Sequence, residues 1–304
     1  MTAAAPVRLR FAPTPNGRLH LGHAYSALFN ERLARAPGGT LLLRIEDIDA
    51  TRAREVHVEA IREDLAWLGV RFDGEAPRQS ARLDVYARSL AALDGRGLLY
   101  RCFCTRADLR ARAAAAPDGP RDPDGAPVAP CRCKAMPRAE IEDRAGAGAS
   151  FAWRLDMARA IEAAPGDLAI EEWGEGDRPA VLRARPEIWG DAVLARKDAP
   201  GGYHLCVVVD DADQSITDVA RGADLREATH LHRLLQALLG LPAPRWRHHR
   251  LVRGADGAKL AKSAASTPIG ELRRQGASAA DVRSWLGFAA ARAGGARPPP
   301  FSLS

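Results

Sequence analysis

The stretch from Arg10 to His23 constrains the fold of this chain most. It reads RFAPTPNGRLHLGH and follows a short alternating apolar run, residues 7–11, which predicts a β-strand. Prolines and a glycine within residues 13–17 interrupt the strand, and after Gly22 apolar residues recur at helical spacing. A strand, a tight loop and a helix in this order present unpaired backbone N–H groups at the helix N-terminus. Since that end of a helix suits phosphate, the stretch predicts a nucleotide site.

Two histidines and a distant basic loop strengthen this prediction. His20 and His23 lie three residues apart, so both imidazoles are expected to flank one phosphate chain, and Gly22 allows close approach of the backbone. The alternative is a pair of loop-packing histidines. The loop KLAKS, which carries Lys259 and Lys262, favours the first interpretation because its cations can neutralise a transferring phosphoryl group.

The next segment predicts a parallel sheet. Residues 40–45 form an apolar strand that ends in Glu46, so strand, helix and strand make a βαβ unit. Arg10 and Glu46 are then expected to converge at the carboxyl edge of the sheet, although Glu46 alone could be a solvated strand end. A further apolar run, residues 205–209, is predicted to return to the sheet as a strand. The expected fold class is α/β, with a Rossmann-type parallel sheet that binds nucleotide.

Four cysteines form two Cys-x-Cys pairs, Cys102 with Cys104 and Cys131 with Cys133. Two such pairs supply enough thiolates for one tetrahedral structural Zn²⁺, and free thiols are the alternative. The fifth cysteine, Cys206, lies inside the apolar run noted above. Disulfides are not expected in a reducing compartment.

Composition sets broad limits. Lys and Arg total 44 against 38 for Asp and Glu, and this net charge of +6 is compatible with RNA as a partner. The sequence has no apolar run long enough to span a membrane and no secretory signal at its start, so we expect a cytoplasmic protein. Sustained apolar heptads are missing too, which favours a monomer.

The predicted organisation has five parts. Residues 1–98 and 195–252 form the two halves of a Rossmann catalytic domain. Residues 99–194 form an inserted zinc-binding, acceptor-type subdomain. Residues 253–290 hold the basic loop and a short helical C-terminal region. Residues 291–304, rich in Gly, Pro and Ser, are predicted to be a disordered tail.

Four blocks in this order resemble the glutamyl branch of the class I aminoacyl-tRNA synthetases: RFAPTPNGRLHLGH, LLLRIEDIDATR, YHLCVVVDDADQSITDVARGADL and GAKLAKS. HLGH and KLAKS stand where that family has its HIGH and KMSKS motifs. The resemblance covers about residues 8–265. It implies activation of L-glutamate with ATP and Mg²⁺ and no covalent enzyme intermediate.

The cysteine-rich insert and the short stretch after Ser263 are similar to the glutamyl-queuosine tRNA(Asp) synthetase family. That family transfers glutamate to queuosine in the anticodon of tRNA(Asp) and needs no tRNA for activation. Three alternatives remain: a compact glutamyl-tRNA synthetase acting on an acceptor end, a different HxGH nucleotidylyltransferase, and a catalytically silent RNA-binding paralogue.

The resemblance assigns roles residue by residue. The glutamate contacts fall on Arg10, Ala12, Pro13, Thr14, Glu46, Tyr203 and Arg221. The ATP contacts fall on His20, Gly22, His23, Lys259 and Lys262, of which His20, His23 and Lys262 are expected to be catalytic. In this assignment Arg221 pairs with the side-chain carboxylate of glutamate, Glu46 holds its ammonium group and Tyr203 supplies a hydroxyl.

Two departures from the family pattern stand out. Family members ligate zinc through three cysteines and a tyrosine four places before the last cysteine, but Pro127 and Ala129 occupy the corresponding positions here. The resemblance therefore leads us to expect Cys133 as the replacement ligand, beside Cys102, Cys104 and Cys131. The basic loop has Ala261 where a serine is usual, but both lysines are kept, so activity is expected.

Overall fold

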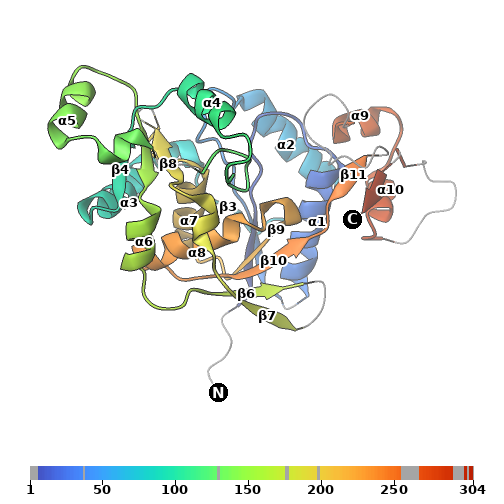
Figure 1. The fold of residues 1–304 in the computed structure, drawn as a ribbon. Helices are drawn as coiled ribbons and strands as arrows, with labels where there is room; N and C mark the ends of the chain where they lie inside the picture. Colours follow the sequence, from blue (N-terminus) through green and yellow to red (C-terminus); the bar gives the residue numbers. More distant parts are fainter. Residues whose placement is uncertain are drawn as a thin grey trace.

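The computed structural model describes residues 6–36, 38–128, 131–174, 178–196, 199–254, 267–289, 298–299 and 301–303. The predicted strand–loop–helix unit is confirmed. It consists of β1 (Arg8–Phe11), α1 (Leu21–Arg35) and β2 (Thr40–Leu43), and β1 pairs with β2 in parallel (Figure 1). The helix starts at Leu21, two residues earlier than the sequence suggested, because His20 serves as its N-cap.

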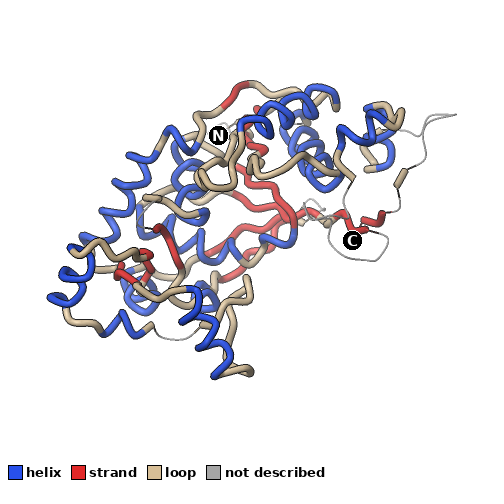
Figure 2. The backbone as a smooth tube through the Cα atoms, turned by 90° about the horizontal axis from the view of Figure 1, so that it is seen from above, coloured by secondary structure: helices blue, strands red, loops and turns tan. Residues whose placement is uncertain are grey.

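Parallel strands form the centre of the molecule. β3 (Gly74–Glu75) extends β1 and β2, and a second sheet has the order β7 (Pro179–Arg183), β6 (Ala169–Trp173), β10 (Arg245–His249), β9 (Asp218–Gly222). Only β7 in this second sheet pairs antiparallel. The Thr217 N–H donates to the Arg8 carbonyl at 3.0 Å, so β9 begins next to β1 and the two sheets continue each other. Figure 2 shows these strands between helices on either side.

The strands bury side chains on two faces, as expected for a doubly covered parallel sheet. In β2, Leu41 and Leu43 belong to the core around α1 and α2 (Glu55–Trp67), whereas Leu42 belongs to the opposite core. That second core contains α3 (Leu83–Gly95), α7 (Tyr203–Asp213) and α8 (Ala228–Leu239). Because Leu9 and Phe11 of β1 pack in the first core, Arg10 between them points toward α7.

The prediction of a strand over residues 205–209 is wrong, because this run lies within helix α7. A short continuous apolar run does not separate a buried strand from a buried helix. All of residues 205–211 are buried, including Asp210 and Asp211. Burial on several sides outweighs the modest cost of three β-branched valines in a helix.

The insert is a mixture of short elements. An antiparallel sheet has the order β4 (Leu99–Cys102), β5 (Ala152–Leu155), β8 (Val193–Arg196). The helices of this part are α4 (Arg106–Ala115), α5 (Arg138–Gly146) and α6 (Met157–Ala163). Single turns occur in this part at η2 (Arg132–Ala135) and η3 (Pro186–Trp189), and outside it at η1 (Gln79–Ala81) and η4 (Ala223–Leu225). Although β6 falls within the expected insert, it pairs with β10 of the parallel sheet; the domain boundaries stay a prediction.

The C-terminal part is helical, as expected, with α9 (Ile269–Arg274) and α10 (Ala279–Trp285). The prediction of a disordered tail is wrong at its end, because Phe301–Leu303 form β12 and pair antiparallel with β11 (Val252–Gly254). Phe301 and Leu303 pack against the core around α1, so this segment has apolar surface to bury. Within the described parts of the chain, no helix has the length and apolarity needed to span a bilayer.

Candidate active site

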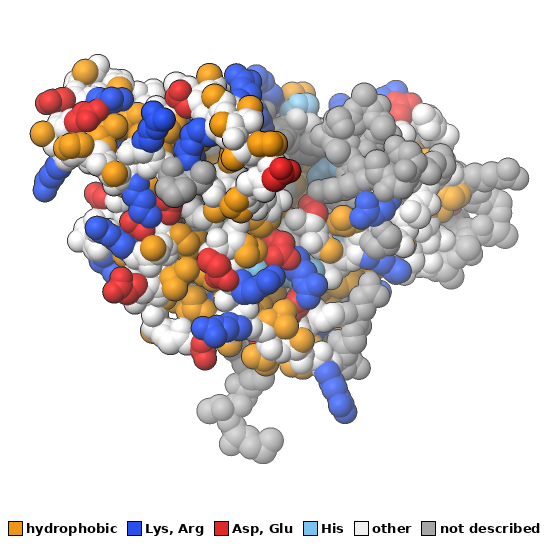
Figure 3. Space-filling model, viewed as in Figure 1, with side chains coloured by type: hydrophobic (Ala, Val, Ile, Leu, Met, Phe, Trp, Pro, Cys, Tyr) orange, Lys and Arg blue, Asp and Glu red, His pale blue; other side chains and the backbone are white. Residues whose placement is uncertain are grey.

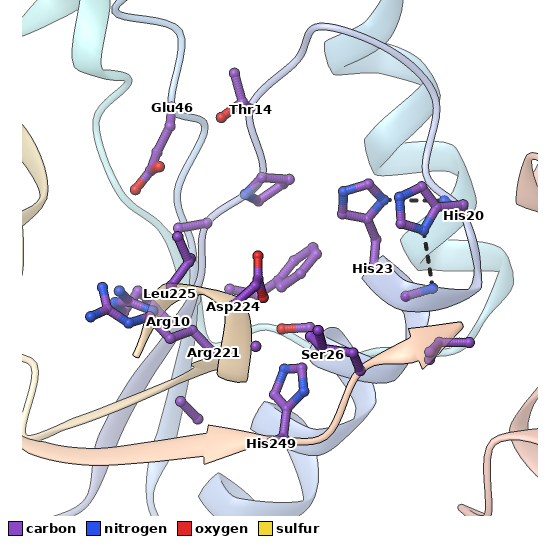
Figure 4. Close-up of a pocket in the computed structure, with 18 of the residues that line it drawn as sticks. Arg10, Thr14, His20, His23, Ser26, Glu46, Arg221, Asp224, Leu225 and His249 are labelled. Carbon is purple, nitrogen blue, oxygen red and sulfur yellow. Dashed lines mark hydrogen bonds between the residues drawn. The ribbon is translucent and has the colours of Figure 1, made fainter. Parts of the chain in front are cut away.

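A cavity of about 560 Å³ opens where β1, β2, β9 and β10 end. Strand ends from several chain segments meet there, as ligand sites of parallel sheets do. The predicted site residues that line it are Arg10, Ala12, Pro13, Thr14, His20, Gly22, His23, Glu46, Tyr203 and Arg221. The two lysines predicted to contact ATP, Lys259 and Lys262, lie outside the described residues. In Figure 4 the guanidinium groups of Arg10 and Arg221 lie at one end of the cavity and the two histidine rings at the other.

The two histidines cap helix α1 reciprocally. The His20 Nδ1 accepts a hydrogen bond from the Gly22 N–H at 3.1 Å, and the His23 Nδ1 accepts one from the His20 N–H at 3.2 Å. This is the arrangement of a capping box, made here by imidazoles. Since both Nδ1 atoms accept, each neutral ring carries its proton on Nε2. The backbone therefore sets the tautomer that can donate to a phosphate oxygen.

Gly22 leaves room for the His20 ring. A Cβ at position 22 would lie 2.9 Å from the His20 Cε1 and 3.1 Å from its Nδ1. The two histidine rings have centroids 3.8 Å apart, so the space beside Gly22 is occupied by side chain. One helix N–H that the sequence suggested was unpaired is thus bonded to His20.

A buried network of charges supports the opposite end of the cavity. The Asp211 carboxylate accepts from the Arg10 Nε at 2.8 Å and from the Arg44 Nη1 at 2.7 Å. Arg44 is fully buried and also donates to the Glu46 Oε1 at 3.0 Å. Burial alone would raise the pKa of Asp211, but Arg10 and Arg44 outweigh it and hold that pKa below its usual value. Burial raises the pKa of Glu46, whose carboxylate lines the cavity.

Arg221 differs from these arginines because its partners are neutral. Its Nη2 donates to the Thr229 Oγ1 at 2.8 Å, its Nη1 to the His232 Nδ1 at 3.2 Å, and its guanidinium lies 4.8 Å from the centroid of the Trp246 ring. The Tyr203 hydroxyl is 3.4 Å away. Among the ion pairs of the described residues, none includes Arg221, although it is only 5% exposed.

The guanidinium groups of Arg44 and Arg221 are both buried but have opposite pKa shifts, because Arg44 contacts carboxylates and Arg221 contacts neutral groups. For Arg44, burial would lower the pKa, but the carboxylates of Asp211 and Glu46 raise it above the ordinary value. For Arg221, burial prevails and the pKa is lowered. An isolated buried cation is costly, and a ligand carboxylate would compensate it. The cavity therefore offers a site for an anionic group at Arg221.

The four cysteines come together, as the sequence predicted. The Sγ atoms of Cys102, Cys104, Cys131 and Cys133 all lie within 4.8 Å of one another. The Cys131 Sγ is 3.2 Å from that of Cys102 and 3.3 Å from that of Cys104. Zn–S bonds of about 2.3 Å in a tetrahedron place sulfurs roughly 3.8 Å apart, so the set fits Zn²⁺ after small adjustments. The nearby Tyr100 hydroxyl instead donates to Asp191 at 2.9 Å.

Several contributors to the site were missed by the sequence reasoning. Arg44 lies in the predicted strand of residues 40–45 but was given no role, and Asp211, which follows the apolar run 205–209, was given none either. Thr229 and His232 lie three residues apart on α8, a spacing that puts both on one helix face. The remaining missed lining residues include Ser26, Asp224, His249 and Arg250.

Comparison with known proteins agrees with this geometry. The sequence model of the family described as tRNA synthetases class I (E and Q), catalytic domain, matches residues 6–287. A glutamyl-Q tRNA(Asp) synthetase from Rhodobacter capsulatus is 44% identical over 92% of this chain and 99% of its own length. A glutamate–tRNA ligase from Gluconacetobacter diazotrophicus is 37% identical over 89% of this chain, but over only 54% of its own length.

A solved structure shares the fold. The glutamate tRNA ligase from Elizabethkingia meningosepticum, determined in complex with its amino acid, superposes with a TM-score of 0.74 at 26% identity. The match covers 93% of this chain and 60% of that one, so this chain spans less than two thirds of that ligase. The chain belongs to the class I tRNA synthetases for glutamate and glutamine and, within them, to the glutamyl-Q tRNA(Asp) synthetase family.

Proposed function

We propose that this enzyme activates L-glutamate with ATP, without tRNA, and transfers it to queuosine in the anticodon loop of tRNA(Asp). The observation that carries the activation step is Arg221, a buried guanidinium with neutral partners at one end of a cavity whose other end holds His20 and His23. The match to relatives of that name over nearly their full length supports the transfer step.

Glutamate occupies the end near Arg221. Its side-chain carboxylate pairs with Arg221 and with the Tyr203 hydroxyl, and its ammonium group binds Glu46. The Glu46 Oε1 is bonded to Arg44, and its Oε2 accepts no hydrogen bond from another described residue. Arg10, Ala12, Pro13 and Thr14 complete the walls beside the substrate. The α-carboxylate then points toward the nucleotide.

ATP occupies the end near the histidines. The Nε2–H groups of His20 and His23 donate to its phosphates, and the backbone N–H groups of Gly22 and His20 hold the His20 and His23 rings, respectively. In the reaction, the α-carboxylate of glutamate attacks the α-phosphorus in line and pyrophosphate leaves with Mg²⁺. Lys259 and Lys262 neutralise charge on the phosphates, so Lys262→Ala should lower the activation rate by about 10²-fold or more while leaving glutamate binding intact.

The remaining assignments concern zinc, RNA and location. Cys102, Cys104, Cys131 and Cys133 hold one structural Zn²⁺ through four thiolates. Because Cys102 ends β4 and Cys133 lies in η2, these thiolates would tie the two segments together and close the long loop between them when Zn²⁺ is bound. The RNA partner is tRNA(Asp) that carries queuosine. We place the reaction in the cytoplasm, where ATP, glutamate and tRNA meet, and propose a monomer.

ATP–pyrophosphate exchange tests the activation step. The enzyme, without tRNA, should exchange labelled pyrophosphate into ATP when glutamate is present and much more slowly with glutamine. Exchange that requires tRNA(Glu) would instead identify a glutamyl-tRNA synthetase of the ordinary kind, and no exchange with any amino acid would favour a silent paralogue.

A further inference from the structure

We propose that His232 and Thr229 are positioning residues that make the site selective for glutamate over glutamine, by holding Arg221 through hydrogen bonds while leaving its charge uncompensated. The inference rests on the proposed function, since it assumes that Arg221 faces the substrate side chain. Neither residue lines the cavity, so they act through Arg221.

The first branch of this network consists of two histidines. The guanidinium can only donate, so the His232 Nδ1, 3.2 Å from the Arg221 Nη1, is the acceptor. The proton of His232 then resides on Nε2 and is donated to the His204 Nδ1 at 3.1 Å. Burial and the neighbouring Arg221 lower the pKa of His204 to about 4, and the pKa of His232 also lies well below its usual value. Both rings are therefore neutral at physiological pH.

The second branch leads away from the cavity. The Thr229 Oγ1 accepts from the Arg221 Nη2 at 2.8 Å and donates to the His248 Nε2 at 3.2 Å. The His248 Nδ1–H is then donated to the Glu172 Oε1 at 2.7 Å, and Glu172 pairs with Arg226 at 2.6 Å. Charged and histidine side chains gather near β10 and β6 in Figure 3. The Arg221 Nε also lies 3.5 Å from the His248 Nε2, so the first carboxylate on this path, Glu172, is separated from Arg221 by the neutral imidazole of His248.

This separation has a consequence for specificity. If a protein carboxylate touched Arg221, the ion pair would be complete before any substrate arrived, and a neutral amide would fit as well as a carboxylate. With neutral acceptors, the cation stays desolvated and unpaired, and only a ligand with a negative side chain completes the pair. Charge-assisted pairs of this kind are stronger than neutral hydrogen bonds, and an unpaired buried charge is strongly disfavoured.

A matched pair of variants tests the proposal. Both Asp and Asn place an oxygen where the His232 Nδ1 lies, because each of these atoms is bonded to Cγ. The two variants have nearly the same shape and both lose the imidazole that contacts His204; they differ in one negative charge and in the amide N–H groups of Asn. The measurement is KM and kcat for glutamate and for glutamine in ATP–pyrophosphate exchange without tRNA, with thermal unfolding of each variant as the check on folding.

We expect His232→Asn to keep the preference for glutamate within about 5-fold of the wild-type enzyme. His232→Asp should raise the KM for glutamate about 100-fold with little change in kcat, because Arg221 contacts the part of the substrate that does not react. The ratio of kcat/KM for glutamate to that for glutamine should fall at least about 10-fold relative to the Asn variant.

Equal KM values and equal ratios for the two variants would overturn the proposal. If the Asp variant does not fold, Thr229→Asp and Thr229→Asn make the same comparison at the other guanidinium nitrogen. Exchange by the wild-type enzyme distinguishes failure of this proposal from failure of the proposed function. If the wild-type enzyme shows no glutamate-dependent exchange, the proposed function itself is refuted. If it shows normal exchange but the variants are indistinguishable, only the role of His232 and Thr229 is refuted.

Discussion

Replacing Asp211 by Asn should destabilise the protein more than a typical substitution. Asp211 is 4% exposed and pairs with the Arg10 Nε at 2.8 Å and the Arg44 Nη1 at 2.7 Å. With charge centres about 4 Å apart and an effective dielectric constant of about 20, each pair contributes about 4 kcal/mol of Coulomb energy. Arg44 would still form its ion pair with Glu46 at 3.0 Å, so part of the Coulomb energy is retained in the variant. Breaking a buried pair typically costs about 3–5 kcal/mol, and we expect that range here.

Urea unfolding measures this loss. For an m-value of about 3 kcal/mol per molar urea, the midpoint should fall by about 1–1.7 M. Asp84→Asn is the matched control, since Asp84 pairs with Arg88 at 2.7 Å but both side chains are more than two thirds exposed. Its midpoint should move by less than about 0.2 M, because exposed pairs contribute little. A shift as small for Asp211→Asn as for Asp84→Asn would refute the reasoning about this buried network.

Three further predictions follow from the site. Gly22→Ala should displace the His20 ring, because the new methyl group would lie 2.9 Å from the His20 Cε1; the KM for ATP in pyrophosphate exchange should rise about 10-fold, and an unchanged KM would contradict the capping role. Cys133→Ser should lower the zinc content measured by metal analysis well below one per chain, whereas full occupancy would exclude Cys133 as a ligand. The unfolded state protonates histidine near pH 6.5, but burial lowers the pKa of His204 to about 4. The free energy of unfolding should therefore fall as the pH drops from about 6.5 to about 4. His204→Gln should reduce the slope of the unfolding free energy against pH, measured by urea titrations in this range, by up to one proton. A slope equal to that of the wild-type enzyme would contradict the assignment of this pH dependence to His204.

The parts of the site that sequence reasoning predicted are those encoded locally. His20 and His23 cap one helix at a spacing of three, so their proximity follows from the helix itself. Arg10 and Glu46 follow from two consecutive strands that pair in parallel. The cysteine cluster could be predicted because two Cys-x-Cys pairs supply the four thiolates that one tetrahedral metal ion needs. In each case the sequence distance or the pairing rule fixes the geometry.

The parts that were missed depend on tertiary packing. Asp211 reaches Arg10 and Arg44 only because residues 205–209 are helical and pack on the second face of the sheet. An apolar run of five residues carries no information on that choice. The neutral shell of Arg221 is assembled from α8 and β10, and nothing local to Arg221 indicates it. The strand at Phe301–Leu303 likewise forms because a partner, β11, lies beside it.

The most direct test of the central claim is transfer of radiolabelled glutamate to tRNA(Asp) with and without queuosine, with the position of the label mapped by nuclease cleavage. The account predicts labelling that requires queuosine and maps to the anticodon loop. Labelling of an acceptor end, or of tRNA(Asp) without queuosine to the same extent, would contradict it.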